Sequence, residues 1–180
     1  MKVKSVYTVI FLLNLVGSAV AQKDHLSSKA GEVSFGLGIG LPYGALGGRL
    51  GVNVIDNLNL FGGVGYQLAG VGYNFGILKD FETNSATQFY LQGMFGSNAA
   101  IVVEGLDEYD QIYTGVTFGL GVKINSQRTE GNFWDIGLLV PIRTDEFKAD
   151  EETVKNDPRI SEFNEAFPVL LTVGFNFNLK

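Results

Sequence analysis

The sequence predicts an all-β fold, a closed antiparallel up-and-down β-barrel of eight strands. Two observations support this prediction. In segment after segment, apolar residues alternate with glycine or polar residues, which is the two-residue period of a strand whose faces differ. No segment after residue 21 keeps a helical period of 3.6 residues, and a length of 180 residues suits one domain.

Four predicted strands occupy the first part of the chain, at residues 32–41, 45–55, 58–68 and 71–78. In the first, EVSFGLGIGL, apolar residues alternate with Ser34 and three glycines, so that one face is apolar and the other nearly bare. Asp56-Asn57 is a two-residue hairpin signal between the second and third strands. The third strand alternates less cleanly, because Phe61 falls on its glycine-rich face.

Four more predicted strands follow, at residues 87–103, 112–124, 133–143 and 167–180. The segment 87–103 is either one long strand, with Ala99 and Ile101 on its apolar face, or two strands that turn at residues 96–98. The chain therefore has eight or nine strands. The one helical candidate is residues 161–167, within a long acidic stretch.

Residues 1–21 form a predicted secretory signal peptide. Lys2 and Lys4 precede the apolar run VIFLLNLVGSAV, which closes on an A-x-A motif, so we expect cleavage between Ala21 and Gln22. A membrane anchor is the alternative interpretation. The apolar run has only 12 residues, however, whereas a spanning helix needs roughly 20.

The rest of the chain divides into a polar tether, residues 22–31, and the barrel domain, residues 32–180. The chain has no cysteine, so the exported domain folds without disulfides and cannot be a lipid-anchored lipoprotein. Without the two lysines of the signal, 11 basic and 19 acidic residues leave a net charge of −8. This charge argues against nucleic acid as a partner, because phosphate binding requires a basic surface.

The placement of charged residues indicates which face of each strand meets water. Arg49, Lys123 and Asp135 lie inside predicted strands, Arg143 lies at a strand end, and all four share the glycine-rich face. A surface in water typically has about 25–35% charged residues, so that face is too bare to be the outside of a soluble barrel. If the apolar face contacts lipid, its lack of charge is explained, since Lys or Arg near the bilayer midplane costs about 2–4 kcal/mol.

Arg49, Lys123 and Asp135 are therefore the candidate functional residues, as a polar network in the barrel interior. Polar groups buried in a narrow lumen need partners, and opposite charges supply them. The alternative is that each side chain meets interior water near a rim. The alternation of residues sets neither the heights of these side chains nor their pairing.

If the chain enters the barrel from the periplasmic side, successive loops alternate between the two sides of the membrane. The periplasmic turns are then residues 56–57, 79–86 and 125–131, and the outward loops are residues 42–45, 69–70, 104–111 and 144–166. The last two loops are acidic, and residues 144–166 alone have a net charge of −5. Both acidic loops thus lie outside, where outer-membrane barrels have their longer loops.

Aromatic residues at or near strand ends suggest girdles at the membrane interfaces: Tyr43, Tyr66, Tyr73, Tyr109, Tyr113 and Trp134. With its signal peptide, alternating strands, glycine-rich inner faces and terminal segment FPVLLTVGFNFNLK, the chain resembles the small bacterial outer-membrane β-barrel proteins of the OmpA/OmpX-like class. The resemblance covers the pattern of residues 32–180. It implies a transmembrane barrel with an even number of strands, which favours eight. The chain departs from the class at its end, where Lys180 replaces the terminal aromatic residue of the assembly signal.

Motifs for catalysis and ligand binding are mostly absent from the sequence. Gly36-x-Gly38-x-Gly40 lies inside a strand, whereas a phosphate loop lies between a strand and a helix. His25, the single histidine, lies in the tether, so no Ser-His-Asp constellation or His-rich metal site can form inside the barrel. The acidic loops match no EF-hand spacing, which favours a solvated surface over the alternative of cation binding. We expect no cofactor.

The predicted function is that of an integral protein of the bacterial outer membrane, non-enzymatic, with a structural or surface-interaction role through its acidic extracellular loops. Its expected partners are outer-membrane lipid, the barrel-assembly machinery and an extracellular partner that contacts residues 104–111 and 144–166. Two alternatives stay open: a soluble exported lipocalin-like barrel that binds a small apolar ligand, and a narrow conduit for hydrophobic molecules. A general porin is excluded, because the lumen of an eight-stranded barrel is only wide enough for side chains.

Overall fold

The computed structural model describes residues 28–83, 85–103, 106–126, 129, 131–160 and 165–179. The predicted signal peptide, its cleavage site at Ala21 and Gln22, and the first part of the tether lie outside the described residues. Residues 161–164 of the predicted helix also lie outside them, and residues 165–167 form no helix.

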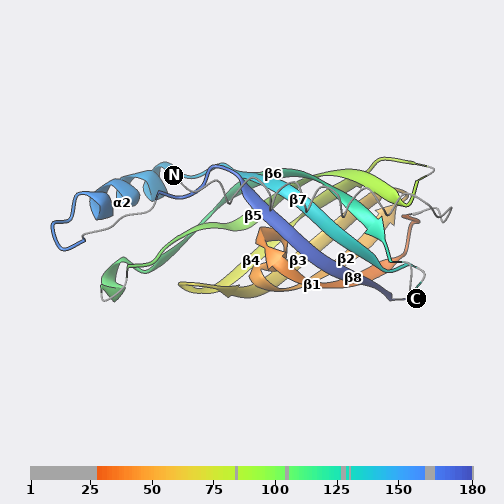
Figure 1. Ribbon diagram of the computed structural model, residues 1–180, viewed down its shortest axis with the longest axis horizontal. Coiled ribbons are helices and arrows are strands. Elements are labelled where there is room, and N and C mark those ends of the chain that lie inside the picture. The colour runs from red at the N-terminus through yellow and green to blue at the C-terminus, as the bar shows by residue number, and fades with distance from the viewer. Residues whose placement is uncertain are drawn as a thin grey trace, which may run out of the picture.

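Eight antiparallel strands close into one barrel in which each strand pairs with its neighbours in the chain and β1 pairs with β8 (Figure 1). The strands are β1 (Val33–Gly40), β2 (Ala45–Ile55), β3 (Leu58–Gln67), β4 (Gly70–Asp80), β5 (Thr87–Ile101), β6 (Gln111–Asn125), β7 (Phe133–Pro141) and β8 (Leu170–Leu179). Residues 87–101 are one strand, which settles the strand number at eight. The predicted architecture, a closed antiparallel up-and-down barrel of eight strands, is confirmed.

The two faces of the wall differ as the alternation predicts. Apolar side chains such as Ile39, Val64 and Leu120 point outward and are more than half exposed. The strands contain five charged residues, of which four are buried inside the barrel: Arg49, Asp80, Lys123 and Asp135. The fifth, Lys79, is exposed beside the end of β4.

The interior also contains an apolar cluster, formed by Leu41, Phe61, Leu78, Tyr90, Met94 and Leu139. This cluster explains the position of Phe61, which breaks the alternation of β3 because its side chain packs inside. The lumen is therefore filled by side chains, as expected for eight strands.

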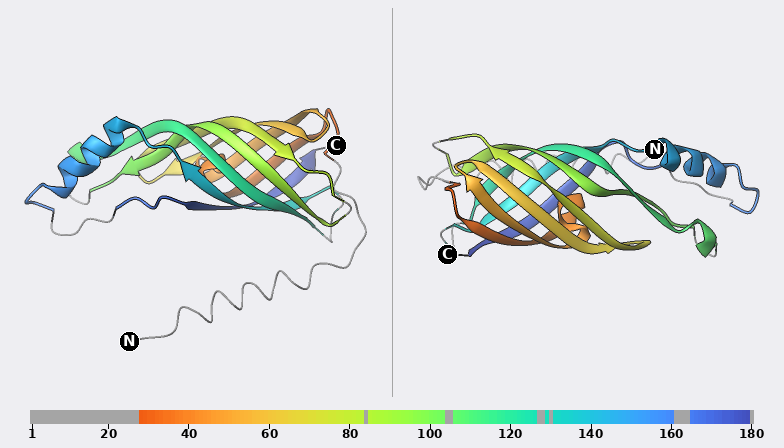
Figure 2. Two further views of the ribbon diagram at one scale, coloured as in Figure 1. Left: turned by 90° about the horizontal axis from the view of Figure 1, so that it is seen from above. Right: turned by 180° about the vertical axis from the view of Figure 1, so that it is seen from behind.

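The turn between β1 and β2 folds into the barrel, and the expectation that residues 42–45 face outward is wrong. The one-turn 3₁₀ helix η1 (Leu41–Tyr43) overlaps these residues, and its three side chains are buried. The ribbon of this turn lies within the barrel in Figures 1 and 2. Glycines make room for it: the three atoms nearest to a Cβ added at Gly174 belong to the Tyr43 side chain, and a Cβ at Gly63 would collide with the carbonyl oxygen of Pro42. Tyr43 is consequently part of the interior and not of an interfacial girdle.

Beyond one end of the barrel, β5 and β6 continue as a hairpin that projects at the same end as α2 (Asp145–Lys155), as Figures 1 and 2 show. A second 3₁₀ helix, η2 (Asp107–Tyr109), lies near the tip of this hairpin. Asn98 is an extra residue in β5, because Ser97 pairs with Thr114 and Ala99 with Tyr113. This bulge reverses the side on which the following residues lie, so Ala99 and Ile101 are buried and not on the outer apolar face as predicted.

The helix α2 begins where the sequence analysis expected only a loop. The side-chain oxygen of Thr144 accepts a hydrogen bond from the Phe147 backbone N–H (3.3 Å), and Asp145 and Glu146 occupy the first turn, so the start of the helix has both a cap and favourable charges. Phe147 and Val154 are buried with Ala99, Ile101 and Tyr113 in a second apolar cluster. We call the described parts of residues 98–116 and 142–167 the loop unit.

Among the described residues, no helix combines the length and the apolar character needed to cross a membrane.

Candidate functional site

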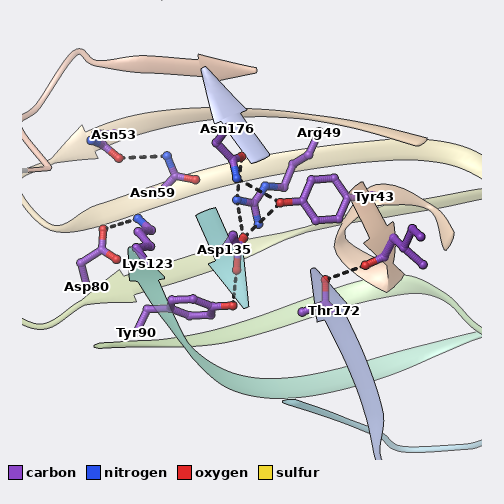
Figure 3. Close-up of polar contacts among 11 residues, drawn as sticks. Tyr43, Arg49, Asn53, Asn59, Asp80, Tyr90, Lys123, Asp135, Thr172 and Asn176 are labelled. Atoms are coloured by element: carbon purple, nitrogen blue, oxygen red, sulfur yellow. Dashed lines mark hydrogen bonds and ion pairs between the residues drawn. The ribbon is translucent and has the colours of Figure 1, made fainter. Parts of the chain in front are cut away.

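The three predicted interior residues are all buried, but they belong to two separate ion pairs (Figure 3). Arg49 on β2 contacts Asp135 on β7, with 2.7 Å between Nη2 and Oδ2. Lys123 on β6 is the cross-strand neighbour of Asp135, yet its Nζ lies 2.6 Å from Oδ2 of Asp80 on β4. The structure thus brings Arg49 and Asp135 together and places Lys123 with a residue that the sequence analysis had assigned to a turn.

The Arg49–Asp135 pair is surrounded by hydrogen-bond partners, and we call Arg49, Asp135, Tyr43, Tyr90 and Asn176 the Arg49 cluster. The Tyr90 hydroxyl donates to Oδ1 of Asp135 (2.5 Å), and the Tyr43 hydroxyl donates to Oδ2 (3.2 Å). Asn176 accepts from Nη2 of Arg49 (3.0 Å) and donates to the Tyr43 hydroxyl (3.1 Å). Both carboxylate oxygens are therefore satisfied, as a buried charge requires.

Aromatic rings complete the surroundings of the guanidinium. The Cζ atom of Arg49 lies 4.9 Å from the centroid of the Tyr43 ring and 5.4 Å from that of Phe61. Such contacts stabilise a desolvated cation. Together with the buried side chains of η1, the Arg49 cluster fills this part of the lumen.

Glycines position the two tyrosines of the Arg49 cluster. A Cβ added at Gly38 would lie 2.8 Å from the Tyr43 ring, and one at Gly174 would collide with the Tyr43 hydroxyl. Gly121 and Gly137, on β6 and β7, lie beneath the hydroxyl end of Tyr90 in the same way. The glycine-rich inner faces therefore provide space for two large side chains that cross the lumen.

The Lys123–Asp80 pair lies nearer the short-turn end of the barrel. Oδ2 of Asp80 also accepts a hydrogen bond from the Ser28 hydroxyl (2.7 Å), and Nζ of Lys123 lies 5.1 Å from the centroid of the Phe133 ring. Ser28 is held in turn by its carbonyl, which accepts from the Asn57 backbone N–H (2.8 Å). The last residues of the predicted tether thus pack against the barrel and help to enclose this pair.

Sequence reasoning missed Ser28, Asp80, Tyr43 and Tyr90 as members of the two interior sites. Asp80 and Tyr90 both occupy inward positions of their strands, and each follows the alternation of its neighbours. Their inward positions in the alternation were the sequence signal that could have identified both residues. Tyr43 and Ser28 lie outside the strands, where alternation says nothing.

Outside the barrel, a network of charged side chains joins the parts of the loop unit. Arg159 and Glu108 are exposed, whereas the Asp157 side chain is only 10% exposed. Nη2 of Arg159 lies 2.7 Å from Oδ2 of Asp157 and 2.8 Å from Oε1 of Glu108, and the Tyr109 hydroxyl donates to Oδ2 of Asp157 (2.7 Å). The hydrogen bonds from Arg159 hold the pKa of the Asp157 carboxyl well below its usual range. Within the described residues, no group of three or more His, Cys, Asp and Glu side chains is arranged to hold a metal ion.

The chain matches no protein-family model, and no curated protein matches it. A crystal structure of the N-terminal β-barrel domain of OprF from Pseudomonas aeruginosa is similar to it, with a TM-score of 0.46 and 17% sequence identity. The match covers 82% of this chain and 98% of that domain. The fold described above follows from the strand pairing of this chain itself.

Proposed function

We propose that the chain is an integral protein of the bacterial outer membrane whose closed barrel carries the loop unit at the cell surface, without enzymatic activity. The observation that carries this proposal is the inverted wall, which has apolar side chains outside and buried charges inside. Outer-membrane barrels have this arrangement, because lipid replaces water around them. Closure of the sheet also pairs the backbone polar groups that lipid cannot hydrogen-bond.

The outer face of the barrel supports a membrane location because it has many exposed apolar side chains and almost no charge. Leu37, Phe75 and Phe118 are each more than half exposed. In water such a belt would be an aggregation site. Lys79 is the single outward charge of the strands, and at the end of β4 it can reach the interface, where a lysine costs little.

The filled lumen supports a non-porin role and weighs against both alternatives. A soluble barrel for an apolar ligand would place its apolar side chains inside and its charges outside. A conduit for hydrophobic molecules would need a continuous apolar passage, whereas the Arg49–Asp135 pair crosses the interior of this barrel. Both carboxylate oxygens of Asp135 are already engaged by Arg49, Tyr43 and Tyr90.

The orientation and partners complete the proposal. The short turns and the segment at Ser28 lie on the periplasmic side, and the loop unit projects from the extracellular side. Outer-membrane lipid then contacts the apolar belt, the barrel-assembly machinery inserts the chain, and the loop unit meets an extracellular partner.

Cell fractionation and detergent gels test the membrane location. We expect the protein in the outer-membrane fraction, with a faster mobility on gels before boiling than after it. Recovery in the soluble periplasm without detergent, with no change of mobility on boiling, would overturn the proposal. Protease added to intact cells tests the orientation, because it should cleave the loop unit and spare the turn at Asp56 and Asn57.

Planar bilayers test whether the lumen is closed. The purified protein should give no conductance steps of porin size. Large, stable steps would contradict a filled lumen even if the membrane location held.

A further inference from the structure

Four inward side chains of β5 occupy every second position: Gln88, Tyr90, Gln92 and Met94. Tyr90 and Met94 belong to the apolar interior cluster. Gln88 is fully buried and Gln92 is 5% exposed. Within the part of the chain that the structure describes, neither the amide nitrogen nor the amide oxygen of either glutamine has a hydrogen-bond partner.

Gln92 lies on the extracellular side of Tyr90, where the described neighbouring residues on the adjacent strands make no hydrogen bond with its amide. Its cross-strand neighbours are Leu78 on β4 and Gly119 on β6. Thr117, a diagonal neighbour on β6, is fully buried, and its hydroxyl oxygen likewise has no partner among the described residues. A buried polar group without a partner costs about 1–3 kcal/mol. A small polar ligand that hydrogen-bonds to Gln92 and Thr117 would remove this cost.

Gln88 lies on the periplasmic side of Tyr90, beside the second ion pair. It is opposite Lys123 on β6 and diagonal to Asp80 on β4. Oδ2 of Asp80 accepts from Lys123 and Ser28, whereas no partner of its Oδ1 lies within the described ranges. The Gln88 amide and this carboxylate oxygen therefore present a free donor and two free acceptors.

The Tyr90 ring divides the two glutamines. It extends from β5 over Gly121 of β6 and Gly137 of β7, where an added Cβ would collide with its hydroxyl oxygen. The hydroxyl is fixed at its far end by Asp135 (2.5 Å). The ring thus forms a shelf across three strands, between the level of Gln88 and that of Gln92.

We propose that the barrel interior binds water at two separate sites, one on each side of the Tyr90 ring. Gln92 and Thr117 hold the first, and Gln88 and Asp80 hold the second. Each site offers three unpartnered polar atoms, which matches the roughly three hydrogen bonds of a buried water molecule. Water suits both sites because neither has excess charge: Asp80 is neutralised by Lys123, and Gln92 and Thr117 are uncharged.

NMR of the purified protein in detergent micelles tests this directly, through cross-relaxation between side-chain amide protons and long-lived water. We expect water cross-peaks at the amides of Gln88 and Gln92. Asn176 is a matched control, because it is fully buried but its Oδ1 already accepts from Nη2 of Arg49 (3.0 Å) and its Nδ2 donates to the Tyr43 hydroxyl (3.1 Å). If both glutamines lack water cross-peaks, as Asn176 should, the proposal is overturned.

The variant Gln92→Met provides a second readout that does not depend on the lifetime of bound water. Methionine has a similar length and no hydrogen-bonding amide, so loss of a water-filled site should lower the urea midpoint of unfolding. A dry, unsatisfied amide predicts the reverse, and a raised midpoint would overturn the Gln92 site. The water cross-peak at Gln88 should survive in this variant, whereas its loss would contradict two separate sites.

Discussion

The barrel wall and the loop unit bury opposite kinds of side chain, although β5 and β6 run through both. Within the wall, inward positions of these strands hold Gln88, Thr117 and Lys123, all buried, while Phe118 is exposed. Above Asn98 the buried residues include Ile101 and Tyr113, and these pack on Phe147 and Val154 of α2, as in a protein surrounded by water.

The surroundings, and not the strands themselves, decide which face of each strand is apolar. In the proposed membrane the wall gains from exposing apolar groups to lipid, whereas the loop unit must bury them from water. One extra residue, Asn98, lets a single strand serve both regions, because a bulge shifts the alternation by one position.

The polar contacts of the two regions differ in the same way. The Arg49–Asp135 side chains are 4% and 0% exposed, whereas those of Arg159 and Glu108 are 54% and 60% exposed. Buried pairs lose much when one partner is removed, because the other charge stays desolvated. Exposed pairs are screened by water and contribute little. This contrast sets the order of the expected effects.

The largest effect is expected from removing one charge of the Arg49 cluster. Asp135→Ala leaves the Arg49 guanidinium buried without its counter-ion, which should destabilise the barrel by about 3–5 kcal/mol. Urea unfolding in detergent micelles measures this change. The double variant Arg49→Met/Asp135→Ala is the control, and it should recover part of the loss because no unpaired charge remains. Equal stability of the single and double variants would contradict the argument.

The second effect should stay local to the loop unit. Phe147 is fully buried and meets Tyr113 edge to face, with ring centroids 5.2 Å apart. Phe147→Ala should therefore open the loop unit, at a local cost of about 3 kcal/mol, and leave the barrel intact. Faster proteolysis of the loop unit, with an unchanged mobility shift on boiling, is the expected result.

Phe167→Ala is the matched control for this change, because the Phe167 side chain is 75% exposed in the same loop unit. It should not alter proteolysis. If Phe147→Ala instead abolished the mobility shift, the loop unit and the wall would be one cooperative structure.

Alternation was enough to predict the wall, because it is a local property of each strand. The faces of β2, β6 and β7 and the burial of Arg49, Lys123 and Asp135 follow from it. The height of a side chain along the barrel axis is not a local property, since it depends on strand tilt and stagger around the whole barrel. Lys123 on β6 has Asp135 as its neighbour on β7, but its partner is Asp80 on β4. Alternation could not predict this pairing, because it does not give the heights of the two carboxylates.

Features that interrupt the alternation could not be predicted from it. The bulge at Asn98 places Ala99 and Ile101 on the side of β5 opposite to the predicted one. The helix η1 places Tyr43 in the lumen and not at the predicted membrane interface. In both places the glycines and small residues were visible in the sequence, but the large side chain that they accommodate comes from another segment. Only the assembled barrel brings Gly174 beneath Tyr43.

A third, smaller effect tests this accommodation of η1. The three nearest atoms to a Cβ at Gly174 all belong to Tyr43, whereas the nearest atom to a Cβ at Gly62, on the outer face, is 4.0 Å away. Gly174→Ala should therefore destabilise the barrel by about 1–3 kcal/mol through overpacking. Gly62→Ala should be neutral or slightly stabilising, because alanine loses less conformational entropy on folding. Urea midpoints compare the two, and equal effects would contradict the role of Gly174.

The smallest effect concerns acid and the charged network of the loop unit. Because Arg159 lowers the pKa of Asp157 in the folded protein, this contact contributes stability above the ordinary aspartate range and loses it only as the pH falls toward the lowered pKa. The NMR signals of the Tyr109 ring, whose hydroxyl donates to Asp157, should thus stay constant from neutral pH to about pH 4, the usual pKa of aspartate, and change only below it. Asp157→Asn should remove this change and leave global unfolding of the barrel unaltered, because the contact lies in the loop unit, outside the barrel wall. A Tyr109 transition centred at the ordinary aspartate pKa would show that Arg159 does not stabilise the carboxylate, and the loop unit would then be held by its apolar cluster alone.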